Sequence, residues 1–598
     1  MALKSFEREG KQLILHTEGT ICTTGREVLQ AEVFQRVVSL FCETLWEQGS
    51  PLLQPFVRIG ESGRNWTRVV NLLRSLAETP LEQVASILPG AEEFIDGANR
   101  RMLHQFVERL YDFWRSFDRF IVLHSEPGPS SLDQRPYRSF NATVEAFTQA
   151  VRGAYRDLGE NITGDKPRVY RQVSAGCNVG LISVPRTSRM PEECEALLRD
   201  ISFIRQVWIT PPLIIDPPMN KRTGQFKKVD TNPLAGLSPA AEKWLCYPAQ
   251  VGPLVIFVYF HQRFMGLGCA LANLFEIATD EQIARGPDAI YLYGAEPEAL
   301  SWFGDLPTVF YDDEANNLLL AAVPGEDRFG YFGYLKKMVL TLHNIVMMKR
   351  GRMPYHGAMV RISLKGGAGA NVLIIGDTAA GKSESLEAFR ILGREHIREL
   401  RVIADDMGSL EVTSDGSILA YGSEIGAFIR LDDLQQGYAF EQIDRAIIMS
   451  PQKVNARVVL PITTLDEVLK GYPVDYLLYA NNYEEVDEDH PVLERFSDAD
   501  RALAVFRDGA AMAKGTTTAT GLVHSYFANI FGPPQYRELH EDLAHQVFNR
   551  AFDAGVYVGQ LRTRLGIEGY ENQGPLEAAK ALFRKISHTE EGNGAQTK

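Results

Sequence analysis

The stretch Gly376-Asp-Thr-Ala-Ala-Gly-Lys-Ser383 (GDTAAGKS) follows the apolar run NVLII (371–375). It matches G-x-x-x-x-G-K-[ST], a pattern in which backbone N–H groups and a helix N-terminus hold phosphate oxygens. The β-branched residues before the glycine predict a buried strand, and SESLEAFRIL (383–392) predicts the helix that follows. Motors, GTPases and small-molecule kinases all use such P-loops, so the motif alone leaves the reaction open.

The motif predicts that a run of small residues and one lysine contact the phosphates. Lys382 is expected to reach the β- and γ-phosphates, and the Ser383 hydroxyl to ligate Mg²⁺. Asp377 is unusual here because a carboxylate near a phosphate is repulsive unless a metal or a base compensates. The predicted nucleotide-binding residues of the loop are Gly376, Thr378, Ala379, Ala380, Gly381, Lys382 and Ser383.

A P-loop works with an acidic residue at the end of a neighbouring strand. The segment RVIADDMG (401–408) places Asp405 and Asp406 directly after β-branched residues. Two adjacent carboxylates at a strand end can serve two metals, or one metal and its water. The alternative is a solvated turn. We interpret the pair as a metal site because of the P-loop upstream.

The composition is that of an ordinary globular protein. Hydrophobic residues make up 45% and charged residues 23% of the 598 residues, which suggests about two to four domains. A net charge of −14 gives a nucleic-acid partner no electrostatic support. The six cysteines form no C-x-x-C pair, and the N-terminus is too charged for a secretory signal. The most apolar window, 252–275, is interrupted by polar residues, which argues against a membrane span. We therefore expect a cytoplasmic protein.

Hydrophobic periodicity divides the chain into a helical part and an α/β part. Apolar positions at three-to-four spacing predict helices across 27–125 and again over 140–157, with a loop or linker at 124–136. From about residue 168, short β-branched runs alternate with helical patterns, which is α/β texture. The strands expected in this part lie at 207–216, 253–260, 288–294, 371–376, 401–406 and 445–450.

The residues around the P-loop resemble phosphoenolpyruvate carboxykinase (PEP carboxykinase). The segment YFGYLKKMVLTLHNIVMMKRGRMPYHGAMV (331–360) is similar to that family's tyrosine, paired-lysine, helix and histidine arrangement. Later segments continue in the family's order. They are IADDMG (403–408), SEIGAFIRL (423–431), NARVVLPI (455–462), DGAAMAKGTTT (508–518) and FANIFGPP (527–534). The resemblance covers 331–598 and extends weakly upstream.

The resemblance implies a metal set of Lys337, His356 and Asp406 for Mn²⁺, with Mg²⁺ on Ser383 beside the nucleotide. A lysine can ligate a metal only as the neutral amine, so its pKa must fall, which burial and a nearby cation achieve. Histidine nitrogen and aspartate oxygen are ordinary ligands. The other roles that the resemblance implies are catalysis by Lys336, Asp405, Lys382, Arg430 and Arg457, a CO₂-side wall by Tyr331, an approach to the base by Arg564, and a lid containing Lys514, Gly515 and Thr516.

The sequence departs from the family at the substrate carboxylate. The family holds this group with an arginine in a threonine-glycine-arginine segment, and the nearest match here, KRTGQFKK (221–228), has Gln225 at the arginine position. Arg222 could take over from a shifted loop. Arg26 and Arg64 in other glycine-arginine segments are alternatives. The phosphate and metal machinery is therefore expected to be kept, and the substrate is left open.

The sequence thus predicts an α/β protein with a PEP carboxykinase-like two-lobed fold and a mostly helical N-terminal extension. The expected parts are the extension (1–165), a substrate-side lobe (166–330), a P-loop lobe (331–590) and a disordered tail (591–598). The leading hypothesis is interconversion of oxaloacetate with phosphoenolpyruvate and CO₂, using ATP or GTP. The alternatives are a kinase of the same fold acting on another small molecule or a protein serine, and a non-catalytic nucleotide sensor. Neither a nucleic-acid nor a membrane partner is expected, and the oligomeric state stays open.

Overall fold

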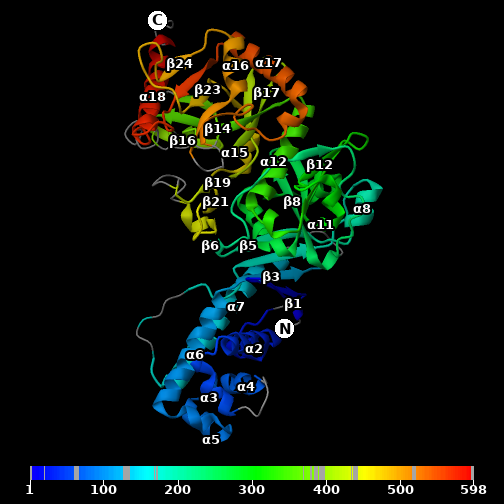
Figure 1. Ribbon diagram of the computed structural model, residues 1–598, viewed down its shortest axis with the longest axis vertical. Coiled ribbons are helices and arrows are strands. Elements are labelled where there is room, and N and C mark those ends of the chain that lie inside the picture. The colour runs from blue at the N-terminus through cyan, green and yellow to red at the C-terminus, as the bar shows by residue number, and fades with distance from the viewer. Residues whose placement is uncertain are drawn as a thin grey trace. The chain divides into compact units, whose positions relative to one another are not determined.

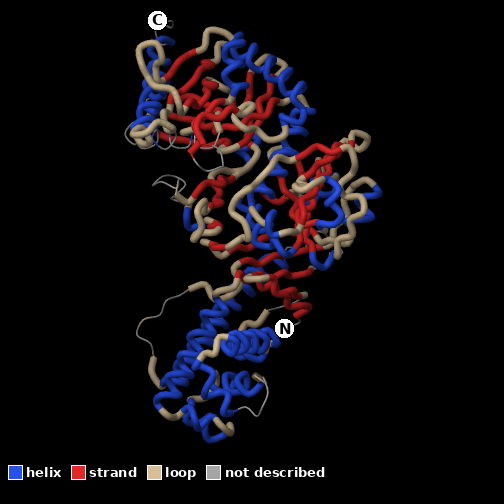
Figure 2. Tube along the Cα trace, viewed as in Figure 1, coloured by secondary structure: helices blue, strands red, loops and turns tan. Residues whose placement is uncertain are grey.

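Helices alternate with strands along the chain, and the strands form large mixed sheets. The computed structural model therefore confirms the expected α/β class (Figures 1 and 2). The structure describes residues 3–18, 21–59, 66–125, 135–166, 169, 173–365, 367, 369–377, 380–382, 385, 388, 397–432, 434, 442–514 and 520–593. The chain divides into two compact units. The first contains Met1–Arg186 with Ser202–Leu213, and the second contains Thr187–Ile201 with Ile214–Lys598.

The first unit packs a helical bundle against a small sheet. Strands β2, β3 and β4 run parallel, with β1 and β5 antiparallel at either side. Its elements are β1 (Leu3–Glu9), β2 (Gln12–Thr17), α1 (Gly25–Gln30), α2 (Glu32–Glu47), α3 (Gln54–Ile59), α4 (Thr67–Leu76), α5 (Leu81–Ile87), α6 (Gly97–Arg115), β3 (Asp118–His124), α7 (Arg135–Thr163), β4 (Val179–Val184) and β5 (Phe203–Ile209). The bundle helices carry apolar stripes that share one core with the inner face of the sheet.

Two expectations for this region need correction. The stretch 118–124 was expected to continue a helix, but α6 ends at Arg115 and Asp118–His124 forms β3. The strands β1 and β2 were not expected at all. The helices predicted at 27–115 and 140–157 are confirmed. Residues 126–134 of the predicted linker and Arg64 lie outside the described part of the chain.

The second unit begins with a mixed sheet in the order β8-β9-β11-β13-β12-β7. Strands β9, β11 and β13 are parallel and fully apolar, as strands covered on both faces are. The elements here are α8 (Glu192–Leu198), β6 (Leu213–Ile215), β7 (Lys227–Val229), β8 (Trp244–Val251), β9 (Leu254–His261), α9 (Met265–Ala270), β10 (Glu276–Ile277), α10 (Asp280–Arg285), β11 (Ala289–Ala295), α11 (Pro297–Leu300), β12 (Val309–Asp313), β13 (Leu318–Pro324) and α12 (Phe332–Lys349).

A second large sheet, in the order β22-β18-β17-β14-β15-β23-β27-β24, follows α12. Strands β19, β21, β20 and β6 form a separate four-stranded sheet, and β25 and β26 form a two-stranded one. The elements of this part of the chain are β14 (Met353–Leu364), β15 (Gly369–Ile375), β16 (Ile397–Ala404), β17 (Met407–Val412), β18 (Ile418–Gly422), β19 (Gly426–Arg430), β20 (Ile447–Met449), β21 (Arg457–Pro461), α15 (Leu465–Leu469), β22 (Tyr472–Pro473), β23 (Tyr476–Asn481), β24 (Leu493–Arg495), α16 (Ala499–Asp508), β25 (Ala510–Lys514), β26 (Thr520–His524), α17 (Arg537–Asp553), β27 (Tyr557–Arg562) and α18 (Gln573–Asn593). Five of the six strand regions predicted from the sequence each contain one strand, whereas 207–216 is divided between the end of β5 and β6.

Strand direction in this sheet brings several functional segments to one edge. Strands β15, β23 and β27 are parallel, so their carboxyl ends lie together. Strand β14 is antiparallel to both β15 and β16, which places the first half of β14 and the end of β16 at that same edge. Ligands of open α/β sheets bind outside the carboxyl ends of the strands. At the other end of the chain, α18 runs to Asn593, into the stretch expected to be a disordered tail.

Candidate functional site

Asp406 is the centre of a buried polar cluster at this sheet edge. Its Oδ2 accepts a hydrogen bond from Lys336 Nζ at 2.7 Å, and its Oδ1 lies 2.9 Å from His356 Nε2. Burial alone would raise the pKa of Asp406, but Lys336 and His356 outweigh burial and hold that pKa well below its usual range. The structure therefore brings together Lys336 from α12, His356 from β14 and Asp406 from the turn between β16 and β17.

Glu424 is a further acidic member of the cluster and contacts Lys336. Its Oε1 lies 3.3 Å from Lys336 Nζ, and the side chain is fully buried. Burial raises the pKa of Glu424 to about 8, against the opposing effect of Lys336. Lys336 has a raised pKa because Asp406 and Glu424 together outweigh its own desolvation. Glu424 stands in the quoted motif SEIGAFIRL, but the sequence analysis assigned it no role.

The ring of His356 faces hydrogen-bond acceptors on both sides. Nδ1 donates to the carbonyl oxygen of Ala528, because a carbonyl can only accept. In the neutral ring Nε2 then carries a lone pair, yet it points at the Asp406 carboxylate, which is also an acceptor. Burial lowers the pKa of His356, which disfavours a proton on both nitrogens. A cation held by both Nε2 and the carboxylate would resolve this conflict.

The carbonyl that fixes His356 belongs to a strained turn. Phe527, Ala528 and Asn529 have φ values of 43°, 58° and 61°, three successive non-glycine residues in the left-handed region. Such backbone costs free energy and persists only where the surroundings hold it. Asn344 contributes to this by donating from Nδ2 to the Phe531 carbonyl oxygen at 2.8 Å. The turn therefore orients a histidine that comes from a distant strand.

Lys337 lies beside the cluster without an ion pair to it. Its Nζ sits 4.5 Å from the centre of the Phe531 ring. Burial, with Lys336 and Arg222 as further causes, lowers the pKa of Lys337 to about 8, although Asp406 opposes the shift. Lys336 is therefore charged and ion-paired, whereas burial brings Lys337 nearer to the neutral amine that a metal ligand needs.

Arg222, and not Gln225, points toward this cluster. The Arg222 guanidinium stacks on Phe531 at 5.4 Å and on Phe226 at 5.1 Å, and burial lowers its pKa. Gln225 is exposed, and its carbonyl oxygen accepts from Thr308 Oγ1 at 3.4 Å. Arg26 belongs to the first unit. Of the candidates for the carboxylate clamp, Arg222 is therefore the one that the structure places beside Lys337.

The glycine loop begins where β15 ends. Gly376 N donates to the His356 carbonyl oxygen at 3.1 Å, so the loop is hydrogen-bonded directly to β14, the strand that carries His356. Lys382 is buried, and its Nζ donates to the Gly376 carbonyl oxygen at 2.6 Å. Asp377 interacts electrostatically with both His356 and Lys337. Thr378, Ala379, Ser383 and most of the helix predicted after them lie outside the described residues.

Gly381 has a positive φ of 90° and lies against Thr563. A Cβ at Gly381 would lie 2.6 Å from Thr563 Oγ1, while a Cβ at Gly555, which has a φ of 76°, would meet nothing within 4 Å. We expect Gly381→Ala to lower the free energy of unfolding by about 3 kcal/mol and Gly555→Ala by about 1 kcal/mol, since both lose glycine's freedom but only the first adds a clash. Urea denaturation followed by circular dichroism measures both, and equal losses would contradict the close approach.

The Phe428 ring lies near Lys336 and near two further candidate site residues, Tyr331 and Arg457. Its ring lies 5.8 Å from Lys336 Nζ and 5.3 Å from the Arg457 guanidinium carbon, and its centre is 6.0 Å from that of Tyr331. Arg457 Nε is buried and has no hydrogen-bond partner among the described residues. Arg430 is the cross-strand neighbour of Arg457 and pairs with Asp432. Tyr331 and Arg457 thereby share one aromatic ring that the sequence did not single out, and Arg430 lies on the strand beside Arg457.

The other candidates are more dispersed. Arg564 follows β27, stacks on Tyr570 at 4.1 Å and pairs with Glu577. Asp405 is half-buried next to Asp406 and acts electrostatically on Lys336 and Glu424. Lys514 ends β25 of the β25–β26 hairpin, but its side chain, Gly515 and Thr516 lie outside the described part. The lid prediction is therefore not tested.

Comparison with known proteins adds no family assignment. A scan against protein-family models found no matching family, and a search of curated proteins found no match. Within the described residues, no three histidine, cysteine, aspartate or glutamate side chains converge as a metal group, so the candidate set depends on lysine. No described helix is both long and apolar enough to cross a bilayer.

Proposed function

We propose that the chain is a metal- and nucleotide-dependent phosphotransferase resembling PEP carboxykinase, which interconverts oxaloacetate with phosphoenolpyruvate and CO₂ using a nucleoside triphosphate. One observation carries the proposal. His356 Nε2 and the Asp406 carboxylate, both acceptors, face each other at 2.9 Å where the glycine loop begins. A divalent cation satisfies both groups, and the adjacent loop supplies the phosphate site.

The residues present fit Mn²⁺ or Mg²⁺ by their donor chemistry. Lys337 Nζ, His356 Nε2 and a carboxylate oxygen of Asp406 would hold the first ion, and Ser383 would hold the second beside the nucleotide. When bound, the first ion supplies positive charge next to the oxygen on which negative charge develops. Lys336, itself held by Glu424, keeps Asp406 ionised and in place, and Ala528 keeps the lone pair of His356 on Nε2.

The surrounding side chains have complementary tasks. Arg222 would bind the carboxylate that the substrate keeps, while the bond to its other carboxyl group breaks and CO₂ leaves. The electron pair of that bond forms the enolate, whose oxygen attacks the γ-phosphorus as the nucleoside diphosphate departs. Lys382 and Arg457 would neutralise the transferring phosphoryl group. The Nε of Arg457, which has no hydrogen-bond partner in the described part of the chain, is a donor for this purpose.

The direct test supplies purified protein with Mn²⁺, Mg²⁺, oxaloacetate and either ATP or GTP. The expected result is formation of phosphoenolpyruvate that depends on both metal and nucleotide, and carboxylation of phosphoenolpyruvate in reverse. If neither direction proceeds with either nucleotide, the assignment of oxaloacetate as substrate is wrong.

A kinase of the same architecture is the second candidate. The exposed position of Gln225, where the family has its substrate-binding arginine, favours it. Such a kinase would transfer the γ-phosphoryl group to a hydroxyl of another small molecule or to a protein serine. Transfer from labelled ATP to a screened metabolite or protein, together with no activity on oxaloacetate, supports the kinase over the carboxykinase.

A further inference from the structure

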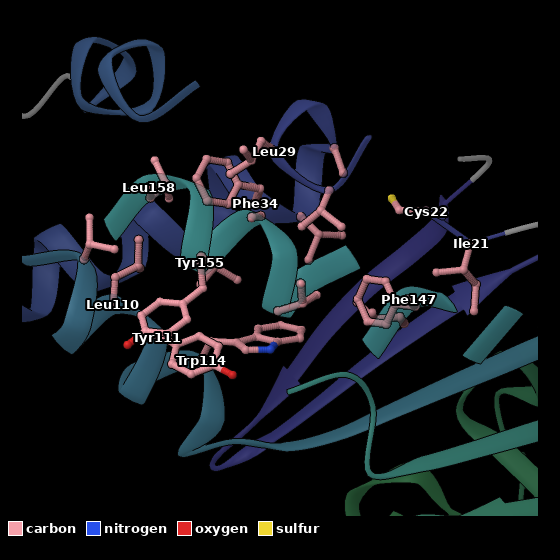
Figure 3. A pocket seen from close by; sticks show the side chains of 18 residues that line it. Ile21, Cys22, Leu29, Phe34, Leu110, Tyr111, Trp114, Phe147, Tyr155 and Leu158 are labelled. Carbon is pink, nitrogen blue, oxygen red and sulfur yellow. The ribbon is translucent and has the colours of Figure 1, made fainter. Parts of the chain in front are cut away.

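The first unit contains a cavity that the proposed phosphotransfer chemistry does not use. It has a volume of about 100 Å³ and is lined almost wholly by apolar side chains of α1, α2, α6, α7 and β2, among them Leu29, Phe34, Leu110 and Leu158 (Figure 3). Apolar cavities of roughly this size stay dry, and one of about 150 Å³ takes up benzene. A short aliphatic chain or a single small ring therefore matches the space.

Two stacked tyrosines line both this cavity and an adjoining polar cleft. The rings of Tyr111 and Tyr155 lie 4.0 Å apart at an interplanar angle of 8°, and both line the cavity. Both also line the neighbouring cleft of about 390 Å³, whose other walls carry arginines and carboxylates. Tyr155 is anchored by donating from its hydroxyl to Glu108 at 2.7 Å. The apolar cavity and the charged cleft are thus both lined by the rings of Tyr111 and Tyr155.

Arg152 lines the polar cleft, among three arginines and three carboxylates, without an ion pair to a described residue. Arg115 in the same cleft pairs with Asp112 at 3.2 Å. Arg152 instead donates from Nε and Nη2 to one neutral acceptor, the Val173 carbonyl oxygen, at 3.0 and 2.7 Å. No carboxylate of the described residues forms an ion pair with Arg152, which leaves its Nη1 edge for another anion.

We propose that the first unit binds a small amphipathic monocarboxylate, with its apolar part in the cavity and its carboxylate on Arg152. The cleft also contains Glu108 and Asp112, whose negative charges disfavour a dianion such as a phosphate ester. The Tyr111 and Tyr155 rings would pack along the ligand where its apolar part meets its head. This site shares no residue with the phosphotransfer cluster, so it stands or falls independently of the proposed reaction.

The test is a ligand-observed NMR titration of the full-length protein with straight-chain carboxylates from acetate to octanoate, and with the matching primary alcohols. We expect the Kd to fall about fourfold for each added methylene until the cavity is full, and then to level off. Each alcohol should bind at least tenfold more weakly than its acid. Absence of saturable binding by every acid, or equal affinity of acids and alcohols, would overturn the proposal.

Three variants locate the binding. Ala31→Leu fills the cavity from the half-buried junction of α1 and α2 and should weaken octanoate binding at least tenfold. Arg152→Gln should weaken it about tenfold and remove the preference for acid over alcohol. Arg109→Gln changes an exposed arginine on α6 that lines neither space, and should leave the Kd unchanged. Thermal melts establish that each variant is folded, and wild-type affinity in folded Ala31→Leu or Arg152→Gln protein would refute the site.

Discussion

Replacement of Asp406 by asparagine is expected to abolish both tight Mn²⁺ binding and phosphoryl transfer. The amide cannot supply a charged oxygen ligand, and it leaves His356 Nε2 without its anionic neighbour. We expect the Kd for Mn²⁺ to rise by at least about 100-fold. Stability should also fall, by about 3 kcal/mol, because Lys336 loses its closest carboxylate in a buried site. Electron paramagnetic resonance titration of Mn²⁺ and urea denaturation measure the two effects.

Asp475→Asn is the matched control. Asp475 is an exposed residue directly before β23, and its Oδ2 accepts from Asn371 N at 2.7 Å. It lies at the opposite ends of the strands from Asp406, so its substitution should cost some stability and leave the Mn²⁺ affinity unchanged. Mn²⁺ binding by Asp406→Asn at wild-type affinity would remove Asp406 from the metal site.

Lys382→Met is expected to reduce nucleotide-dependent transfer by about 1,000-fold while sparing the metal at His356. Lys382 is buried at the glycine loop, and its Nζ donates to the carbonyl oxygen of Gly376. Its charge disfavours positive charge at His356, so its removal should not weaken Mn²⁺ binding. Steady-state transfer kinetics and the same Mn²⁺ titration separate the two effects.

Lys580→Met provides the comparison for this variant, because Lys580 is exposed on α18. It should retain wild-type transfer. If Lys382→Met also retained wild-type transfer, the glycine loop would not be the phosphate site. The proposed reaction would then have no nucleotide-binding site.

The sequence predicted the strands and turns that depend on short stretches of neighbouring residues. The β-branched run before Gly376 forms β15, and Asp405 and Asp406 follow β16 as expected. The contact of His356 with Asp406 follows from strand direction, since β14 is antiparallel to both β15 and β16. Motif spacing therefore identified these polar residues before any pairing of strands was known.

The sequence was less informative about partners that act through tertiary contacts. Phe428 and Phe531 are ordinary apolar residues in sequence, and only packing places them under Lys336 and Lys337. The run RFIV at 119–122 was wrongly assigned to a helix because a short apolar run does not distinguish strand from helix. Its pairing with β2, more than 100 residues earlier in the chain, decides the outcome.

We propose that Lys337, His356 and Asp406 would hold a divalent metal beside the glycine loop. Anomalous diffraction at the manganese edge, from crystals grown with Mn²⁺ and ATP, tests this site directly. We expect a peak within bonding distance of Lys337 Nζ, His356 Nε2 and an Asp406 carboxylate oxygen. A difference map without a peak there, from crystals in which the nucleotide is bound at the loop, would contradict it.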